Sequence, residues 1–312
     1  MEKIQYNIDR HPLRGIIPPV ITPLIAQNEL DQTGLERLVD HMISAGVHGL
    51  FILGTTGEGP SLSYPLRYEI TERVCNQVNG HLPVLVGITD TSLSESVKLA
   101  ERAASRGADS VVAAPPYYFT SSQSELEGYF QILADQSPLP LFLYNMPSHT
   151  KVNIEAETVA KLSEHENIIG LKDSSGNLVY FQKVVRLMED QPGFSLLVGP
   201  EELLMQSVLS GAHGGVNGGA NMFPKLYVKM YEAARSENVD EMKRLQKIIM
   251  KISSTIYSVG NSPESYLQGV KSALSVMGIC SDVMALPGQS QSADEKKRVR
   301  KAIENLEDEW KT

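Results

Sequence analysis

The stretch PLFLYNMPSHTKVNIEAETVAKLSEHENIIGLK, residues 140–172, decides the fold. It begins with an apolar run over Pro140–Asn145, continues with helical patterning over Ile154–His165 and ends with a second apolar run over Ile168–Lys172. Two near-continuous apolar runs joined by a helix are typical of a β–α–β unit whose parallel strands are buried on both faces. The stretch therefore predicts a parallel sheet that is covered by helices.

The same pattern of apolar runs and helical segments recurs along the chain. The predicted strands are Gly15–Ile21, Gly49–Leu53, Val84–Ile88, Ser110–Ala114, Pro140–Asn145, Ile168–Lys172, Ser195–Val198 and Gly214–Val216. The predicted helices between them are Leu35–Ala45, Tyr64–Asn79, Leu93–Arg106, Ser124–Asp135, Ile154–His165, Leu178–Met188 and Glu201–Ser210. Eight alternating units favour a closed barrel over an open doubly wound sheet, and no GxGxxG motif follows the first strand. We predict the α/β class, with a (β/α)8 TIM barrel and a C-terminal helical extension.

After Pro224 the pattern is helical only. The predicted helices there are Leu226–Ser236, Val239–Ser254, Tyr266–Met277 and Ala293–Trp310. We expect a barrel catalytic domain over residues 1–224 and a helical domain over residues 225–312. The helical domain would pack on the barrel or form subunit contacts.

Composition excludes several classes of protein. Hydrophobic residues make up 42% of the 312 residues and charged residues 21%, which is ordinary for a globular protein with a sizeable core. The net charge is −9 and no Lys/Arg cluster occurs, so nucleic acid is not an expected partner. An anionic substrate would need a local cation or hydrogen-bond donors to overcome this charge.

The cysteines and the apolar runs bear on the compartment. Cys75 and Cys280 are far apart and fit neither a disulfide framework nor a zinc site, which favours the reducing cytoplasm. The residues up to Gly15 lack the apolar core of a signal peptide, and no run of 18 apolar residues would span a membrane. We expect a cytoplasmic protein that binds no membrane.

Lys172 is the first candidate for a catalytic residue. Strand alternation would place Ile168, Gly170 and Lys172 on one face, and barrel enzymes carry their sites at the C-terminal ends of the strands. A lysine that points into an apolar barrel has a lowered pKa, because burial disfavours its charged form. The neutral amine can attack a ketone. The alternative is a lysine that snorkels from the strand end into solvent.

Tyr144 ends the preceding predicted strand, so it should lie beside Lys172. A phenol next to an imine-forming lysine can transfer protons as a general acid and base. The alternative is a half-buried tyrosine whose hydroxyl bonds to the backbone.

The run Gly54-Thr55-Thr56-Gly57-Glu58 joins a predicted strand to a helix. Its glycines permit close backbone approach, and its amide groups and two hydroxyls can bind a carboxylate. The alternative is an ordinary strand-to-helix turn with a capping threonine. Glu58 fits a role in bracing this loop better than a role in catalysis.

Other chemistries find no support in the sequence. No Ser/His/Asp or Cys/His nucleophile arrangement is present, and the seven histidines lack the spacing of metal ligands. The glycine-rich run at residues 214–219 has no P-loop lysine after it.

Four motifs together resemble the dihydrodipicolinate synthase/N-acetylneuraminate lyase superfamily, and the resemblance covers nearly the whole chain. They are GTTGE at residues 54–58, YNMP at 144–147, GLKDSSGN at 170–177 and Gly-Gly-x-Asn at 214–217. The resemblance implies an eight-fold barrel, a homotetramer, no metal and no organic cofactor. It also implies small-molecule substrates, namely pyruvate or another 2-oxo acid and an aldehyde.

The resemblance further implies a role for individual residues. Lys172 matches the lysine that forms an imine with the keto carbon, and Tyr144 matches the tyrosine that shuttles protons. Thr55 and Thr56 match the residues that hold the substrate carboxylate and connect the proton relay, with Gly54 beside them. Tyr118 matches a tyrosine that reaches the active site of the adjoining subunit in several members. Gly199 and Val216 match backbone positions that line the pocket.

One departure from the family pattern concerns the second substrate. The synthases continue YNxP with Ser-Arg-Thr, and that arginine holds the carboxylate of an amino-acid semialdehyde. Here the run is Ser148-His149-Thr150, and histidine is neither permanently charged nor bidentate.

His149 therefore counts against the synthase reaction. The runs Gly57–Leu62 and Tyr117–Phe119 also resemble the 2-keto-3-deoxy sugar acid aldolases more than the synthases. We therefore predict a lyase that cleaves a 2-keto-3-deoxy sugar acid, or a similar 4-hydroxy-2-oxo acid, to pyruvate and an aldehyde. His149 would contact the distal part of that substrate. The alternatives are a synthase that condenses pyruvate with aspartate semialdehyde in lysine biosynthesis, a dehydratase that uses the same imine, and a non-catalytic sensor of an oxo acid.

Overall fold

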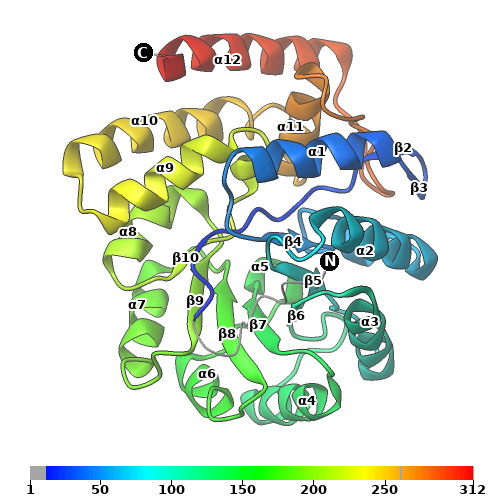
Figure 1. Cartoon of the computed structure of the whole chain (residues 1–312), viewed down its shortest axis with the longest axis vertical. Coiled ribbons are helices and arrows are strands. Elements are labelled where there is room, and N and C mark those ends of the chain that lie inside the picture. The colour runs from blue at the N-terminus through cyan, green and yellow to red at the C-terminus, as the bar shows by residue number, and fades with distance from the viewer. Residues whose placement is uncertain (1–11, 261, 312) are drawn as a thin grey trace.

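The computed structural model describes residues 12–260 and 262–311, the last five of these as backbone only. Eight parallel strands form one sheet, which the helices surround (Figure 1). They are β1 (Gly15–Ile16), β4 (Leu50–Ile52), β5 (Val84–Gly87), β6 (Ser110–Ala113), β7 (Leu141–Asn145), β8 (Ile168–Asp173), β9 (Ser195–Val198) and β10 (Gly214–Gly215). The backbone N–H of Val20 donates to Phe51 O at 2.8 Å, just beyond β1, so the two ends of the sheet meet. The predicted barrel is confirmed.

The first predicted strand is shorter than expected because of its prolines. Pro18 and Pro19 have no backbone N–H to donate to a ladder, and β1 ends at Ile16. The sequence also did not predict the antiparallel pair β2 (Leu24–Ala26) and β3 (Glu29–Leu30).

The outer helices pack their apolar stripes on the sheet. They are α1 (Gln32–Ser44), α2 (Tyr64–Val78), α3 (Leu93–Arg106), α4 (Gln123–Gln136), α6 (Ala156–Leu162), α7 (Leu178–Leu187) and α8 (Leu204–Leu209). Helix α1 shows why they form: Asp31 caps its first turn by accepting from Gly34 N at 2.8 Å. Its residues Leu35, Leu38 and Met42 recur at helical spacing and are buried.

A separate apolar cluster fills the inside of the barrel. Its buried members are Leu13, Ile17, Phe51, Leu85, Val112, Ala114, Phe142, Tyr144, Leu197 and Val216. Gly170 belongs to the same interior, because an added Cβ there would lie 2.4 Å from the Phe142 ring. The described interior is thus packed with side chains, and the C-terminal end of the barrel is the place where a ligand would bind.

The prediction that Ile168 shares a face with Gly170 and Lys172 is wrong. The register shifts between Leu141, which pairs with Ile168, and Phe142, which pairs with Gly170. This shift gives β8 one extra residue, so Ile168 packs in the outer core. Gly170 and Lys172 keep the spacing of two that points both into the barrel.

The residues from Pro224 onward form helices, as predicted: α9 (Pro224–Arg235), α10 (Val239–Thr255), α11 (Ser265–Val276) and α12 (Ala293–Lys311). Helix α9 packs on α8 and β1, which is the place of the eighth barrel helix. Helices α10, α11 and α12 lie together at one end of the molecule (Figure 1). The boundary at residue 224 stays a prediction. Within the described residues, none of the helices is long and apolar enough to cross a membrane.

Candidate active site

Lys172 and Tyr144 are paired neighbours at the C-terminal ends of β8 and β7. The Lys172 Nζ lies 3.5 Å from the centroid of the Tyr144 ring, and both side chains are 5% exposed. The predicted proximity of these two residues is confirmed. Lys172 is not a solvated strand-end lysine.

Asn145 follows Tyr144 in the sequence, and Asp173 follows Lys172. Both point away from the barrel interior and brace the two strand ends. Asn145 Nδ2 donates to Asp173 Oδ1 at 2.9 Å, which links β7 to β8. Asn145 Oδ1 accepts from Ile154 N at 3.0 Å, and Asp173 Oδ1 also accepts from Ser175 N at 3.1 Å. Since strand side chains alternate, this fixed outer layer holds Lys172 and Tyr144 on the inner face.

Burial controls the ionisation of the pair. Desolvation lowers the pKa of Lys172 below the usual lysine range, although Tyr144 and Asp173 act in the opposite direction. Burial alone would raise the pKa of Tyr144, but the Lys172 ammonium and the hydrogen bonds around the phenol outweigh it and leave the pKa lowered. A neutral amine and an acidic phenol are thus accessible nearer to neutral pH than in free side chains.

Two hydroxyls complete the polar contacts of the pair. Thr55 Oγ1 and Tyr144 Oη are 3.1 Å apart, so the loop after β4 reaches the phenol. Lys172 Nζ donates to Ser174 Oγ at 3.0 Å. Ser174 was not predicted, although its position two residues after Lys172 on an alternating strand was the available signal. Gly199 makes room for it, because a Cβ at Gly199 would lie 2.1 Å from Ser174 Oγ.

A pocket of about 760 Å³ opens over these side chains. Its lining includes the predicted site residues Gly54, Thr55, Thr56, Tyr144, His149, Lys172, Gly199 and Val216. Tyr118 is 77% exposed and lies outside the lining, whereas its neighbour Tyr117 takes part in it. The pocket thus combines the strand ends with most of the motifs found in the sequence.

His149 lies on the short helix α5 (Pro147–Thr150), directly after the YNMP run. Its Nδ1 is 3.0 Å from Ser148 Oγ, and Lys151 Nζ donates to Ser148 O at 2.6 Å. Partial burial and the cations Lys151 and Lys172 lower the pKa of His149. The imidazole is therefore neutral at physiological pH and offers one donor and one acceptor to a ligand.

The C-terminal helices contribute a part of the pocket that the sequence did not predict. Glu201, at the start of the 3₁₀ turn η2 (Glu201–Leu203), is buried and accepts from Tyr227 Oη at 2.6 Å and from Tyr257 Oη. Burial raises the pKa of Glu201 to about 7. Tyr257 and Tyr266 line the pocket from beyond the barrel. No local motif announces these contacts, because they join residues that are far apart in the chain.

Comparisons with known proteins agree with this geometry. The model of the dihydrodipicolinate synthetase family matches residues 12–306. The 4-hydroxy-tetrahydrodipicolinate synthase of Pelobacter propionicus is 32% identical over 274 residues, 88% of this chain and 92% of the relative. The probable 2-dehydro-3-deoxy-D-pentonate aldolase YjhH of Escherichia coli is 32% identical over 285 residues, 91% of this chain and 93% of the relative.

Two solved structures are similar over almost the whole chain. The dihydrodipicolinate synthase of Bacteroides thetaiotaomicron has a TM-score of 0.93 and 55% identity, with 95% of this chain and 99% of that chain covered. YagE of E. coli, a member of the dihydrodipicolinic acid synthase family in complex with pyruvate, has a TM-score of 0.88 and 29% identity over 94% and 98% of the two chains.

Proposed function

The chain belongs to the dihydrodipicolinate synthetase family of class I carbon–carbon lyases, and we propose that it cleaves a 4-hydroxy-2-oxo acid to pyruvate and an aldehyde. A 2-keto-3-deoxy sugar acid is the proposed substrate class. The observation that carries the proposal is the buried contact between Lys172 and Tyr144 in the lining of a pocket of about 760 Å³.

In the proposed reaction, the neutral Lys172 amine adds to the keto carbon, and loss of water gives an imine. Tyr144 then takes the proton of the 4-hydroxyl group while the bond between carbons 3 and 4 breaks. The aldehyde leaves, and the electron pair remains on the substrate as an enamine. Protonation of carbon 3 and hydrolysis of the imine release pyruvate and restore Lys172. Throughout, Thr55, Thr56 and the adjoining backbone would hold the carboxylate.

The charges around the pocket support a hydroxylated distal part of the substrate. Among the described lining residues the cations are Lys151 and Lys172, and no arginine occurs. Glu202 and Glu264 also line the pocket, and carboxylates accept hydrogen bonds from hydroxyl groups. A second substrate carboxylate would meet these anions without a bidentate partner.

The second candidate is the synthase reaction, in which pyruvate condenses with aspartate semialdehyde. Its support is the 55% identity to a structure described as a dihydrodipicolinate synthase. To distinguish the two, pyruvate would be incubated with a panel of aldehydes, including sugar-derived aldehydes and aspartate semialdehyde, and the products read by mass. We expect products with the sugar-derived aldehydes; a product with aspartate semialdehyde alone would refute the aldolase proposal.

His149→Arg tests the residue on which the choice of substrate rests. An arginine at this position adds a permanent, bidentate cation to the pocket lining. We expect kcat/KM for aspartate semialdehyde to rise about tenfold or more, by analogy with hydrogen bonds to charged groups, and that for sugar-derived aldehydes to fall. His149→Gln, which stays neutral, is the control and should not favour the semialdehyde. An equal response in both variants would remove position 149 from the specificity argument.

The assembly and the compartment are further parts of the proposal. We propose a homotetramer in which the exposed Tyr118 reaches the active site of an adjoining copy. The exposed aromatic side chains Tyr118 and Phe119, whose ring centroids are 4.9 Å apart, support such a contact. The cytoplasm is the proposed compartment.

A further inference from the structure

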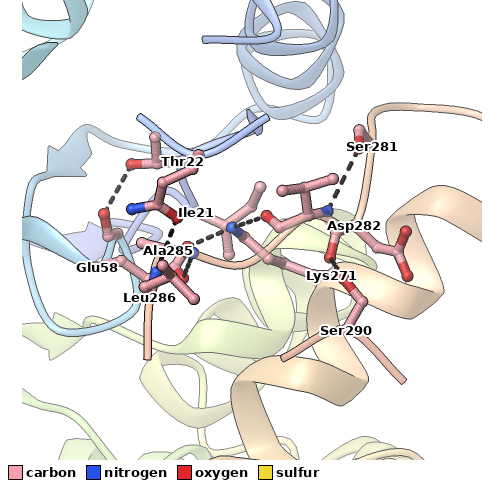
Figure 2. A network of polar contacts seen from close by, with 12 residues as sticks. Ile21, Thr22, Glu58, Lys271, Ser281, Asp282, Ala285, Leu286 and Ser290 are labelled. Carbon is pink, nitrogen blue, oxygen red and sulfur yellow. Dashed lines mark hydrogen bonds and ion pairs between the residues drawn. The ribbon is translucent and has the colours of Figure 1, made fainter. Parts of the chain in front are cut away.

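The C-terminal helices place a buried cation against the loop that carries Thr55 and Thr56. Lys271 on α11 is 0% exposed and forms an ion pair with Glu58, which is 7% exposed. Lys271 Nζ also donates to Val283 O at 2.7 Å. In Figure 2 Lys271 lies at the centre of a polar network that joins the Glu58 loop to the segment 281–286.

Glu58 is bound on both of its carboxylate oxygens. Oε2 faces Lys271, and Oε1 accepts from Ala285 N at 2.7 Å. A buried ion pair is a costly way to join two segments, since both charges must leave water. Burial accordingly raises the pKa of Glu58 and lowers that of Lys271. Neither group contacts Lys172 or Tyr144 in the described structure, so the proposed chemistry does not account for the pair.

The backbone conformation at Glu58 is the feature that the Glu58–Lys271 pair holds in place. Glu58 has φ of 54°, in the left-handed region that non-glycine residues seldom adopt. Immediately before it, Gly57 O accepts from Thr22 Oγ1 at 2.7 Å, and a Cβ at Gly57 would lie 2.9 Å from Val20 O. The loop is therefore fixed at Gly57 by a hydrogen bond to the barrel and at Glu58 by the contacts of its side chain with Lys271 and Ala285. Loss of the Glu58 side-chain contacts would remove one of the anchors of the backbone that carries Thr55 and Thr56.

We propose that the Glu58–Lys271 pair is a positioning element for binding the substrate carboxylate. It holds residues 54–58 in the conformation that directs their amide groups and the two threonine hydroxyls toward the carboxylate of the 2-oxo acid. The inference rests on the proposed function. It assigns a part of substrate binding to helix α11, which lies outside the barrel.

The test compares two ketones that differ in the carboxylate. Pyruvate and its neutral methyl ester both present the same keto group to Lys172, and borohydride converts either imine into a stable adduct. The second-order rate constant for adduct formation is measured by mass spectrometry for each ketone, per folded protein. Three variants are used: Glu58→Gln, Lys271→Met and the double variant. Glu58→Gln keeps the shape and an acceptor for Ala285 N, and the double variant leaves no unpaired buried charge.

We expect the preference for pyruvate over its methyl ester to fall about tenfold or more in these variants, because small displacements of binding groups have effects of that size. The rate with the methyl ester should change much less. Leu274→Ala is the matched control: Leu274 is fully buried on the same helix, and its side chain is not one of the polar partners of Glu58, which are Lys271 and Ala285.

A preference that stays at the wild-type value in every folded variant would overturn the inference, and so would an equal loss in Leu274→Ala. If the wild-type protein traps neither ketone, the proposed function fails and the inference fails with it. Normal trapping by the wild type with an unchanged preference in the variants refutes only the positioning role.

Discussion

Lys172→Ala should abolish the covalent adduct that borohydride forms between the protein and pyruvate. It should also reduce kcat for aldol cleavage to the background, because no other described side chain provides an amine beside Tyr144 and Thr55. Class I chemistry depends on this amine, so the loss should exceed a factor of about 10³. Intact mass and peptide mapping after reduction would measure the first effect, and product formation the second.

The same variant should fold. The Lys172 ammonium is buried, and the hydroxyl of Ser174 is its direct hydrogen-bond acceptor. Since burial of the amine costs free energy, its removal should leave the melting temperature unchanged or raised. Lys151→Ala is the control, because Lys151 lines the same pocket and is exposed. The control should still form the adduct; an adduct that persists in Lys172→Ala and disappears in Lys151→Ala would reassign the nucleophile.

The pH dependence of adduct formation with pyruvate is a second test of Lys172 as the nucleophile. Burial lowers the pKa of Lys172 from the ordinary value of 10.5, so the neutral amine becomes available at lower pH than in free lysine. The rate of imine formation should therefore rise with pH and reach half of its maximum below 10.5. A half-maximum at or above the ordinary lysine value would contradict the buried, neutral nucleophile.

The sequence was sufficient to predict those parts of the site that depend on strand order. Lys172, Tyr144 and Thr55 each end or follow a strand, and a barrel brings all strand ends to one face. The register shift in β8 could not be predicted, because alternation by two assumes a regular ladder and Ile168 departs from it. The shift has little effect on the prediction of the site, since Gly170 and Lys172 lie beyond it in the strand.

The contacts from the C-terminal helices were beyond the reach of sequence patterns for a different reason. Lys271 follows Glu58 by more than two hundred residues, and each stands in an ordinary helical or loop context. A buried ion pair has no periodicity, so its partners emerge only when the helices are placed on the barrel. The same holds for Glu201, whose acceptor role toward Tyr227 and Tyr257 depends on where α9 and the end of α10 pack.

Tyr144→Phe should lower kcat by about 10²- to 10⁴-fold, the usual range for the loss of a general acid and base, with little change in the shape of the pocket. The ring packs in the barrel interior beside Phe51, and phenylalanine keeps this packing. The hydroxyl lies 3.1 Å from Thr55 Oγ1 and also interacts with Lys172 and Ser174, so the change removes the proton transfer and these hydrogen bonds.

The two halves of the reaction should respond differently to this change. Lys172 remains, so pyruvate should still be trapped by borohydride in Tyr144→Phe, although more slowly. Cleavage of the bond between carbons 3 and 4 needs a base at the 4-hydroxyl and should show the larger loss. Tyr180→Phe is the control: it removes a partly buried hydroxyl that donates to Ile154 O at 2.6 Å, outside the pocket lining, and should leave kcat within about threefold. Equal losses in the two variants would mean that Tyr144 supports the fold and not the proton transfer, and the pairing of a lysine nucleophile with a tyrosine base would then have to be abandoned.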